Sequence, residues 1–140
     1  MNAAIIYESL TGNTRQAAHF MARELGAAGV TASVFPVTQI DYQALAVADV
    51  VIVGTWTDGI FVFGQRPGRA QRLRQLPVID HKQCLVYCTY ALDPGKTLQK
   101  MSRILEERGA KVLGGMAIRR NNLEGGSKDF VDRLLEAIPA

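Results

Sequence analysis

Short runs of apolar residues alternate along the chain with longer segments in which apolar residues recur every three or four positions. The short runs have the length and composition of buried β-strands, and we expect strands at residues 3–7, 30–35, 50–54, 84–89 and 111–117. Val50–Gly54 is the most hydrophobic run, so it belongs at the centre of a sheet that is covered on both faces. The alternation of strands and helices predicts an α/β fold with a doubly wound parallel sheet of five strands.

Four segments between and after these strands show the spacing of amphipathic helices. The first helix should end where glycines stand at 26 and 29, and the second should have Pro67 in its first turn and stop before Pro77. The third should end at Gly109, and Ser127 is the expected N-cap of the last. No linker or repeat interrupts the pattern, so we expect all 140 residues to form one domain.

Composition restricts the class of protein further. Apolar residues make up 48% of the chain and charged residues 21%, as in ordinary globular domains. No apolar run approaches the ~20 residues that span a bilayer, and no basic residue precedes the short apolar stretch at the N-terminus, so we expect a cytoplasmic protein. Cys84 and Cys88 lie on one strand about 13 Å apart, too far for a disulfide, and are expected to be buried thiols.

The net charge of +3 has a local origin. Residues 59–79 contain no acid, whereas four arginines stand at 66, 69, 72 and 74. We call residues Arg66–Arg74 the basic segment. Its simplest interpretation is a solvated helix face, and because no nucleic-acid-binding motif accompanies it, we expect no nucleic-acid partner.

The loop after the first strand carries the clearest candidate chemistry. Ser9–Thr14 places three hydroxyl side chains and a glycine at the start of a helix, where backbone N–H groups and the helix dipole favour a phosphate. No lysine follows, so it is not a Walker loop, and it lacks the three glycines of a dinucleotide fingerprint. A polar turn that only caps the helix is the alternative.

Two segments resemble the flavodoxin family. Ser9-Leu10-Thr11-Gly12-Asn13-Thr14 is similar to the signature [TS]-x-T-G-x-T, which holds the phosphate of FMN in that family. Gly54-Thr55-Trp56-Thr57-Asp58-Gly59 is similar to the T-W-x-x-G segment after the third strand, whose tryptophan stacks on the flavin ring. The resemblance covers the whole chain, and the fifth strand has no insertion, as in the short-chain form of the family. It implies the strand order 2-1-3-4-5, with strands numbered along the chain.

The resemblance also implies which residues bind FMN. Trp56 would stack on one face of the flavin, and Tyr90 would either stack on the other face or pack at the strand end. Backbone groups near Thr89 and Leu92 would bond the pyrimidine edge, although the segment Cys88–Asp93 departs from the usual glycine- and acid-containing pattern. The complete set of expected cofactor-binding residues is Ser9, Leu10, Thr11, Gly12, Asn13, Thr14, Thr55, Trp56, Thr57, Asp58, Gly59, Thr89, Tyr90 and Leu92.

The function that the resemblance implies is a one-electron carrier with non-covalent FMN, without catalytic residues or metal of its own. An FMN-dependent NAD(P)H or quinone reductase, and an FMN-free interaction module on the same fold, are the alternatives. Flavodoxins usually surround the flavin with carboxylates, but here an apolar run, Ile60–Phe63, and then the basic segment follow Trp56. We therefore expect redox partner proteins with an acidic docking face, no membrane partner, and a monomer.

Overall fold

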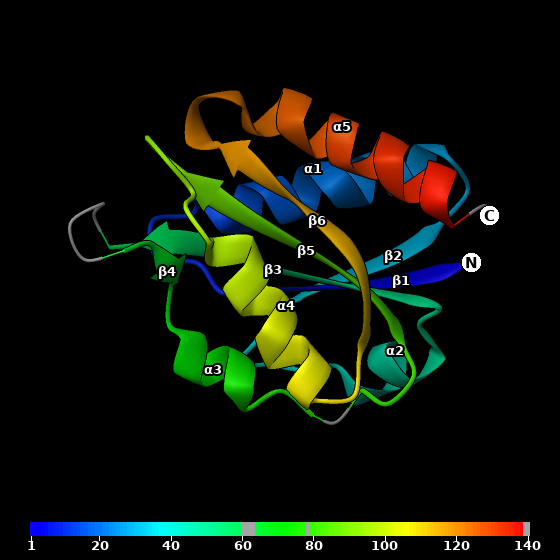
Figure 1. Cartoon of the computed structure of the whole chain (residues 1–140). Coiled ribbons are helices and arrows are strands. Elements are labelled where there is room, and N and C mark those ends of the chain that lie inside the picture. Colours follow the sequence, from blue (N-terminus) through cyan, green and yellow to red (C-terminus); the bar gives the residue numbers. More distant parts are fainter. Residues whose placement is uncertain (60–63, 78, 139–140) are drawn as a thin grey trace.

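Five parallel strands form the centre of the molecule, with helices on both faces (Figure 1). The computed structural model describes residues 1–59, 64–77 and 79–138. The spatial order of the parallel strands is β2-β1-β3-β5-β6, which confirms the predicted α/β fold and its flavodoxin-like strand order. The strands are β1 (Asn2–Tyr7), β2 (Thr31–Pro36), β3 (Val50–Asp58), β5 (Gln83–Tyr90) and β6 (Lys111–Arg119).

Two hydrophobic clusters, one on each face of the sheet, form the core. Helices α1 (Asn13–Ala27) and α5 (Leu123–Ala137) cover one face, and α2 (Tyr42–Val47), α3 (Ala70–Arg74) and α4 (Thr97–Glu107) contribute to the other (Figure 1). The central strand β3 sends Val51 and Val53 to one cluster and Val50 and Ile52 to the other. This two-sided burial explains why its sequence is continuously apolar.

Strand β3 is longer than the apolar run predicts. It continues to Asp58, because Thr57 and Asp58 pair antiparallel with the two-residue strand β4 (Arg66–Pro67). Pro67 therefore lies in β4 and not in the first turn of a helix, and α3 begins only at Ala70. The segment around Trp56, expected to be a loop, is an extended strand whose backbone is fixed by a hairpin.

The start of α5 also differs from the prediction. Ser127 lies inside the helix, fully buried, and its hydroxyl donates to the backbone oxygen of Ala17 in α1 at 3.3 Å. The helix is preceded by the short 3-10 helix η1 (Arg120–Asn122) and begins at Leu123. Gly126 also lies inside the helix. A glycine is needed there because a Cβ would lie 2.6 Å from Cγ2 of Ile118 on β6. Close packing, and not a turn, accounts for this glycine.

The two cysteines are buried, unbonded thiols, as predicted. Burial raises the pKa of Cys84 to about 12 and that of Cys88 to about 11, so both are protonated and unreactive near neutral pH. Among the described residues, no helix combines the length and hydrophobicity needed to cross a bilayer.

Candidate functional site

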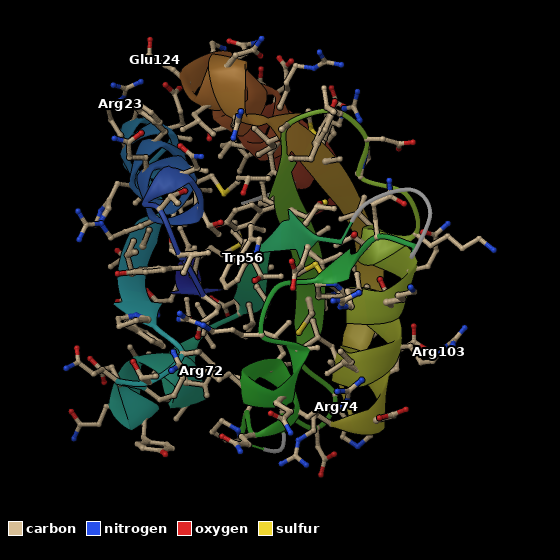
Figure 2. All side chains as sticks on the ribbon, turned by 90° about the vertical axis from the view of Figure 1, so that its left-hand side faces the viewer. Arg23, Trp56, Arg72, Arg74, Arg103 and Glu124 are labelled. Carbon is tan, nitrogen blue, oxygen red and sulfur yellow. The ribbon has the colours of Figure 1, made fainter. Side chains whose placement is uncertain are left out.

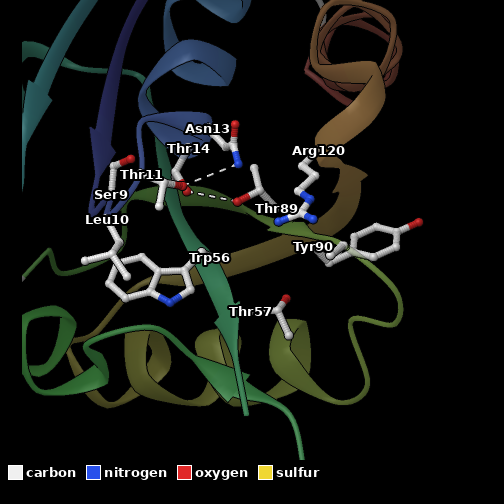
Figure 3. Close-up of a pocket in the computed structure, with 11 residues that line it drawn as sticks. Ser9, Leu10, Thr11, Asn13, Thr14, Trp56, Thr57, Thr89, Tyr90 and Arg120 are labelled. Atoms are coloured by element: carbon white, nitrogen blue, oxygen red, sulfur yellow. Dashed lines mark hydrogen bonds between the residues drawn. The ribbon is translucent and has the colours of Figure 1, made fainter. Parts of the chain in front are cut away.

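A pocket of about 180 Å³ opens at the carboxyl ends of β1, β3 and β5 (Figure 3). This is the edge of a parallel sheet at which α/β proteins bind their ligands. Its lining residues come from three strand ends, the first turn of α1 and η1. They are Ser9, Leu10, Thr11, Asn13, Thr14, Trp56, Thr57, Thr89, Tyr90, Ala91 and Arg120.

The loop between β1 and α1 has the geometry of an anion site. Gly12 occupies the N-cap position with φ of 100°, a left-handed conformation that favours glycine, and its N–H donates to the Ser9 hydroxyl at 3.1 Å. Within the described part of the chain, no side chain caps the N-terminus of α1, and its first turn contains no acid. The N–H groups of that turn are therefore available to a ligand, and the helix dipole makes an anionic one favourable.

Strand β5 holds the start of α1 in place through buried hydrogen bonds. Thr14 shares a 3.0 Å hydrogen bond with the Thr89 hydroxyl, and the Tyr87 hydroxyl donates to the backbone oxygen of Thr14 at 2.9 Å. A Cβ at Gly54 would lie 2.0 Å from Cζ of Tyr87, so this ring needs a glycine beside it. Complete burial raises the pKa of Tyr87 far above its ordinary value, so the hydroxyl remains a donor at any working pH.

The Trp56 ring rests on the hairpin that leads into α3. A Cβ at Gly68 would lie 2.0 Å from Cε2 of the indole, and the guanidinium carbon of Arg69 lies 5.4 Å from the ring centroid. Two hydrogen bonds hold this hairpin: Gly68 N–H donates to the Trp56 backbone oxygen at 2.7 Å, and the Thr55 hydroxyl donates to the Gly68 backbone oxygen at 2.8 Å. The ring is thus packed from one side and lines the pocket with the rest of its surface.

A buried carboxylate with two half-exposed arginines lies beside this tryptophan. The Glu8 side chain is only 4% exposed, and its Oε1 accepts from Nη1 of Arg69 at 2.7 Å and from Nη1 of Arg72 at 2.9 Å. Arg69 adopts φ of 47°, in the left-handed region, as it enters α3. The carboxylate at the end of β1 therefore holds the arginine that contacts Trp56, and it neutralises part of the basic segment.

The structure brings most of the predicted cofactor residues together, with five exceptions. Among the residues that line the pocket are Ser9, Leu10, Thr11, Asn13, Thr14, Trp56, Thr57, Thr89 and Tyr90. Gly12 and Asp58 are next to lining residues in the chain without lining the pocket themselves, and Gly59 is one position further away. The Thr55 side chain is wholly buried and serves the hairpin, and Leu92 is 79% exposed outside the pocket.

Two lining residues, Ala91 and Arg120, were not predicted. Arg120 comes from η1, directly after β6, and Figure 3 shows its guanidinium in the same view as Thr89 and Asn13. No motif marks it in the sequence, but the strand order places the end of β6 next to the end of β5, which is a signal that could have found it. The predicted apolar run Ile60–Phe63 lies outside the described residues.

The aromatic side chains and one hydroxyl complete the pocket. Figure 3 shows Trp56 and Tyr90 on opposite sides of it, and the guanidinium carbon of Arg119 lies 5.5 Å from the centroid of the Tyr90 ring. Thr57 also lines the pocket, and its hydroxyl oxygen is buried beside the thiol of Cys88.

The pocket therefore combines an uncapped helix start, hydroxyl donors and two aromatic rings at the switch point of a doubly wound sheet. The family model described as a flavodoxin domain matches residues 4–121. The chain belongs to the flavodoxin family.

Solved structures agree with this assignment at the level of the fold. A cysteine-to-serine mutant of flavodoxin from Pseudomonas aeruginosa has a TM-score of 0.76 and 21% identity, with 100% of both chains covered. Oxidised flavodoxin 2 from Bacillus cereus has a TM-score of 0.76 and 20% identity, covering 99% of this chain and 100% of that one. Two-electron reduced flavodoxin from Megasphaera elsdenii has a TM-score of 0.70 and 18% identity, covering 93% and 98% respectively. No curated protein sequence is significantly similar to this chain.

Proposed function

We propose that this chain binds FMN without a covalent bond and carries electrons one at a time between partner proteins. The observation that carries the proposal is the uncapped start of α1, surrounded by hydroxyls, in the same pocket as the Trp56 ring. The start of α1 suits a phosphate, and the Trp56 ring suits an aromatic heterocycle. FMN contains both groups. The family membership supports this cofactor, and the two free, buried thiols support a reducing compartment such as the cytoplasm.

The residues of the pocket fit the chemical groups of FMN. The hydroxyls of Ser9 and Thr11 and the N–H groups of the first turn of α1 would hold the phosphate. Trp56 supplies an aromatic face for the flavin ring. The cofactor supplies the redox chemistry, and these residues bind and orient it.

The size of the pocket favours a carrier over an enzyme with a second substrate. Its volume of about 180 Å³ is below the roughly 300–1,000 Å³ of sites that enclose a small molecule. The phosphate and the sugar-alcohol chain would occupy this volume, and Trp56 and Tyr90 would hold the flavin ring near the surface. An electron can leave such a ring directly to a docked protein, because electron transfer needs no substrate cavity.

Titration of the apo protein with FMN tests this proposal. The chain has a single tryptophan, so quenching of its fluorescence reports on Trp56 alone. We expect near-stoichiometric quenching at micromolar FMN and a flavin absorption spectrum that remains with the protein after desalting. Trp56→Phe should still bind FMN, whereas a wild-type protein that stays colourless and unquenched contradicts the proposal and favours an interaction module.

Mixing the FMN-loaded protein with NADH or NADPH separates a carrier from a reductase. A carrier has no nicotinamide site, so its flavin absorption should fade only after a separate flavodoxin reductase is added. Rapid bleaching by the nicotinamide alone would contradict the carrier and assign a reductase activity.

A further inference from the structure

A groove between α3 and α4 is lined by four basic side chains and lies apart from the pocket. It has a volume of about 410 Å³. Arg66 and Arg74 line it from β4 and α3, and Lys100 and Arg103 line it from α4. Glu107 is the single acid among the lining residues. We call this feature the basic groove.

The cations of the basic groove are largely without acidic partners. Arg69 and Arg72 are bound to Glu8 and do not line it. Arg74 and Arg103 have no acidic group within 4 Å among the described residues. Figure 2 shows Arg74 on α3 and Arg103 on α4, the two helices beside the basic groove. The two arginines therefore attract an anion with most of their charge unneutralised.

The other two cations are only weakly engaged. Lys100 donates to the backbone oxygen of Gln65 at 2.8 Å, which fixes its position and leaves its charge intact. Arg66 lies 3.9 Å from Asp58, and both side chains are about half exposed, so this ion pair neutralises little.

The floor of the basic groove is apolar. Pro67 and Ile104 line it and are buried, and Ala70 beside them is partly buried. Nucleic acid would need aromatic or polar groups for its bases, and the described lining contains no aromatic residue. Cations above an apolar floor suit a polypeptide whose carboxylates and apolar side chains alternate.

The basic groove is connected to the hairpin that holds Trp56. Its residues Arg66 and Pro67 pair with Asp58 and Thr57 in the β3–β4 ladder, and Gly68, the next residue, contacts the Trp56 ring. The Arg66 end of the basic groove is therefore joined through β4 to the hairpin on which the Trp56 ring rests. A protein segment bound at that end would contact this hairpin.

We propose that the basic groove binds an acidic segment of the protein with which this chain exchanges electrons. The proposal rests on the proposed function, because it assigns the docking site of the carrier's partner. Within the basic segment, Arg74 would bind the partner together with Arg103 from α4, whereas Arg69 and Arg72 are paired with Glu8. Arg74 and Arg103 would bind carboxylates, and Lys100 would steer the approach.

Binding of a model acidic peptide to the FMN-loaded protein tests the proposal. The probe is a short fluorescein-labelled peptide that alternates Glu with Leu, followed by fluorescence anisotropy at rising salt. The double variant Arg74→Glu/Arg103→Glu should bind it at least about tenfold more weakly, since close charge pairs at interfaces contribute this much or more. Salt should weaken binding to the wild type steeply and binding to the variant little.

A double variant of equal charge serves as the control. Lys111→Glu/Arg133→Glu changes exposed residues of β6 and α5, which lie outside the basic groove. It should keep the peptide affinity within about twofold and carry the same change of net charge. Equal losses in both double variants would overturn the proposal, because the peptide would then respond to net charge alone.

The FMN affinity of each variant separates the two proposals. Both double variants should bind FMN as the wild type does, because none of the four residues lines the pocket. A wild type that binds FMN but ignores the peptide overturns only the docking site. Tighter binding of single-stranded DNA than of the peptide, lost in Arg74→Glu/Arg103→Glu, would also overturn it and assign a nucleic-acid surface instead.

Discussion

The start of α1 and the basic groove attract anions by opposite means. At the start of α1, hydroxyls and backbone N–H groups face the pocket, and the first turn of the helix is held by buried hydrogen bonds from β5. At the basic groove, exposed guanidinium and ammonium groups extend from two helices. The first arrangement uses oriented dipoles in a fixed position, and the second uses net charge on flexible side chains.

The two arrangements suit different ligands. Fixed dipoles select for shape and keep their strength at physiological salt, which is what a tightly held cofactor requires. Exposed charges act at longer range, accelerate encounter and weaken with salt, which suits a partner that must bind and leave. Between the two regions lies Glu8, whose carboxylate binds Arg69 and Arg72 of the basic segment.

Replacing Glu8 by Gln should have the largest effect of the predicted substitutions, measured as a loss of stability, because the Glu8 carboxylate joins the two regions. The substitution leaves Arg69 and Arg72 without their anionic partner and frees the arginine that contacts Trp56. Breaking a buried ion pair costs about 3–5 kcal/mol, and the half-exposed arginines reduce this to roughly 2–3 kcal/mol in the free energy of unfolding. Urea denaturation of Glu8→Gln measures it.

Glu124→Gln is the matched control for this prediction. Glu124 pairs with Arg23 at 3.2 Å with both side chains exposed, so its loss should cost under about 1 kcal/mol. Equal destabilisation by the two variants would show that the Glu8 cluster behaves as an ordinary surface ion pair.

A change at Gly68 should disturb the aromatic side of the pocket and spare the anion site. In Gly68→Ala, the new Cβ would lie 2.0 Å from Cε2 of Trp56, so the indole must move. We expect FMN affinity to fall by about tenfold, the equivalent of about 1.4 kcal/mol, with Trp56 quenching reduced at saturation. Fluorescence titration measures both quantities.

Gly26→Ala provides the control, because a Cβ at Gly26 meets nothing within 4 Å and φ there is not left-handed. It should bind FMN normally and should stabilise α1 slightly, since alanine favours the helix over glycine. Unchanged FMN binding in Gly68→Ala would mean that the indole position does not matter for the cofactor.

The sheet and the anion loop were predictable because their signals are local. Apolar runs located every parallel strand, and a glycine followed by polar residues marked the start of α1. The extension of β3 to Asp58 could not be predicted in this way. Its partner β4 is only two residues long and includes Pro67, so β4 shows no periodicity of its own. A hairpin whose paired residues are eight and ten positions apart leaves no trace in an apolar pattern.

Buried polar contacts between distant residues were also beyond the sequence. Ser127 has the chemistry of a helix cap, but its hydroxyl bonds Ala17 across two packed helices. Glu8 and Arg72 are 64 positions apart, and only the fold shows that they meet. The basic segment therefore looked like one uniform charged surface, whereas the structure divides it into paired and unpaired arginines.

Replacing Arg120 by Gln should have the smallest effect, a modest loss of FMN affinity. This variant tests whether the anion site depends on neutral dipoles alone. It is the arginine among the residues that line the pocket, and it is exposed on η1. Exposed charges contribute about 0.2–1 kcal/mol, so Arg120→Gln should weaken FMN binding by about two- to fivefold at low salt. Riboflavin lacks the phosphate and should bind the variant and the wild type equally, as flavin fluorescence titration can measure.

Arg133→Gln, on α5 and outside the pocket, removes the same charge and should leave both affinities unchanged. At high salt the difference between Arg120→Gln and the wild type should disappear, because screening removes the contribution of an exposed charge. The remaining FMN affinity then measures what the hydroxyls and the helix start contribute by themselves. A loss of riboflavin affinity as large as that of FMN would instead place Arg120 against the flavin ring, and the phosphate would be held without any side-chain charge.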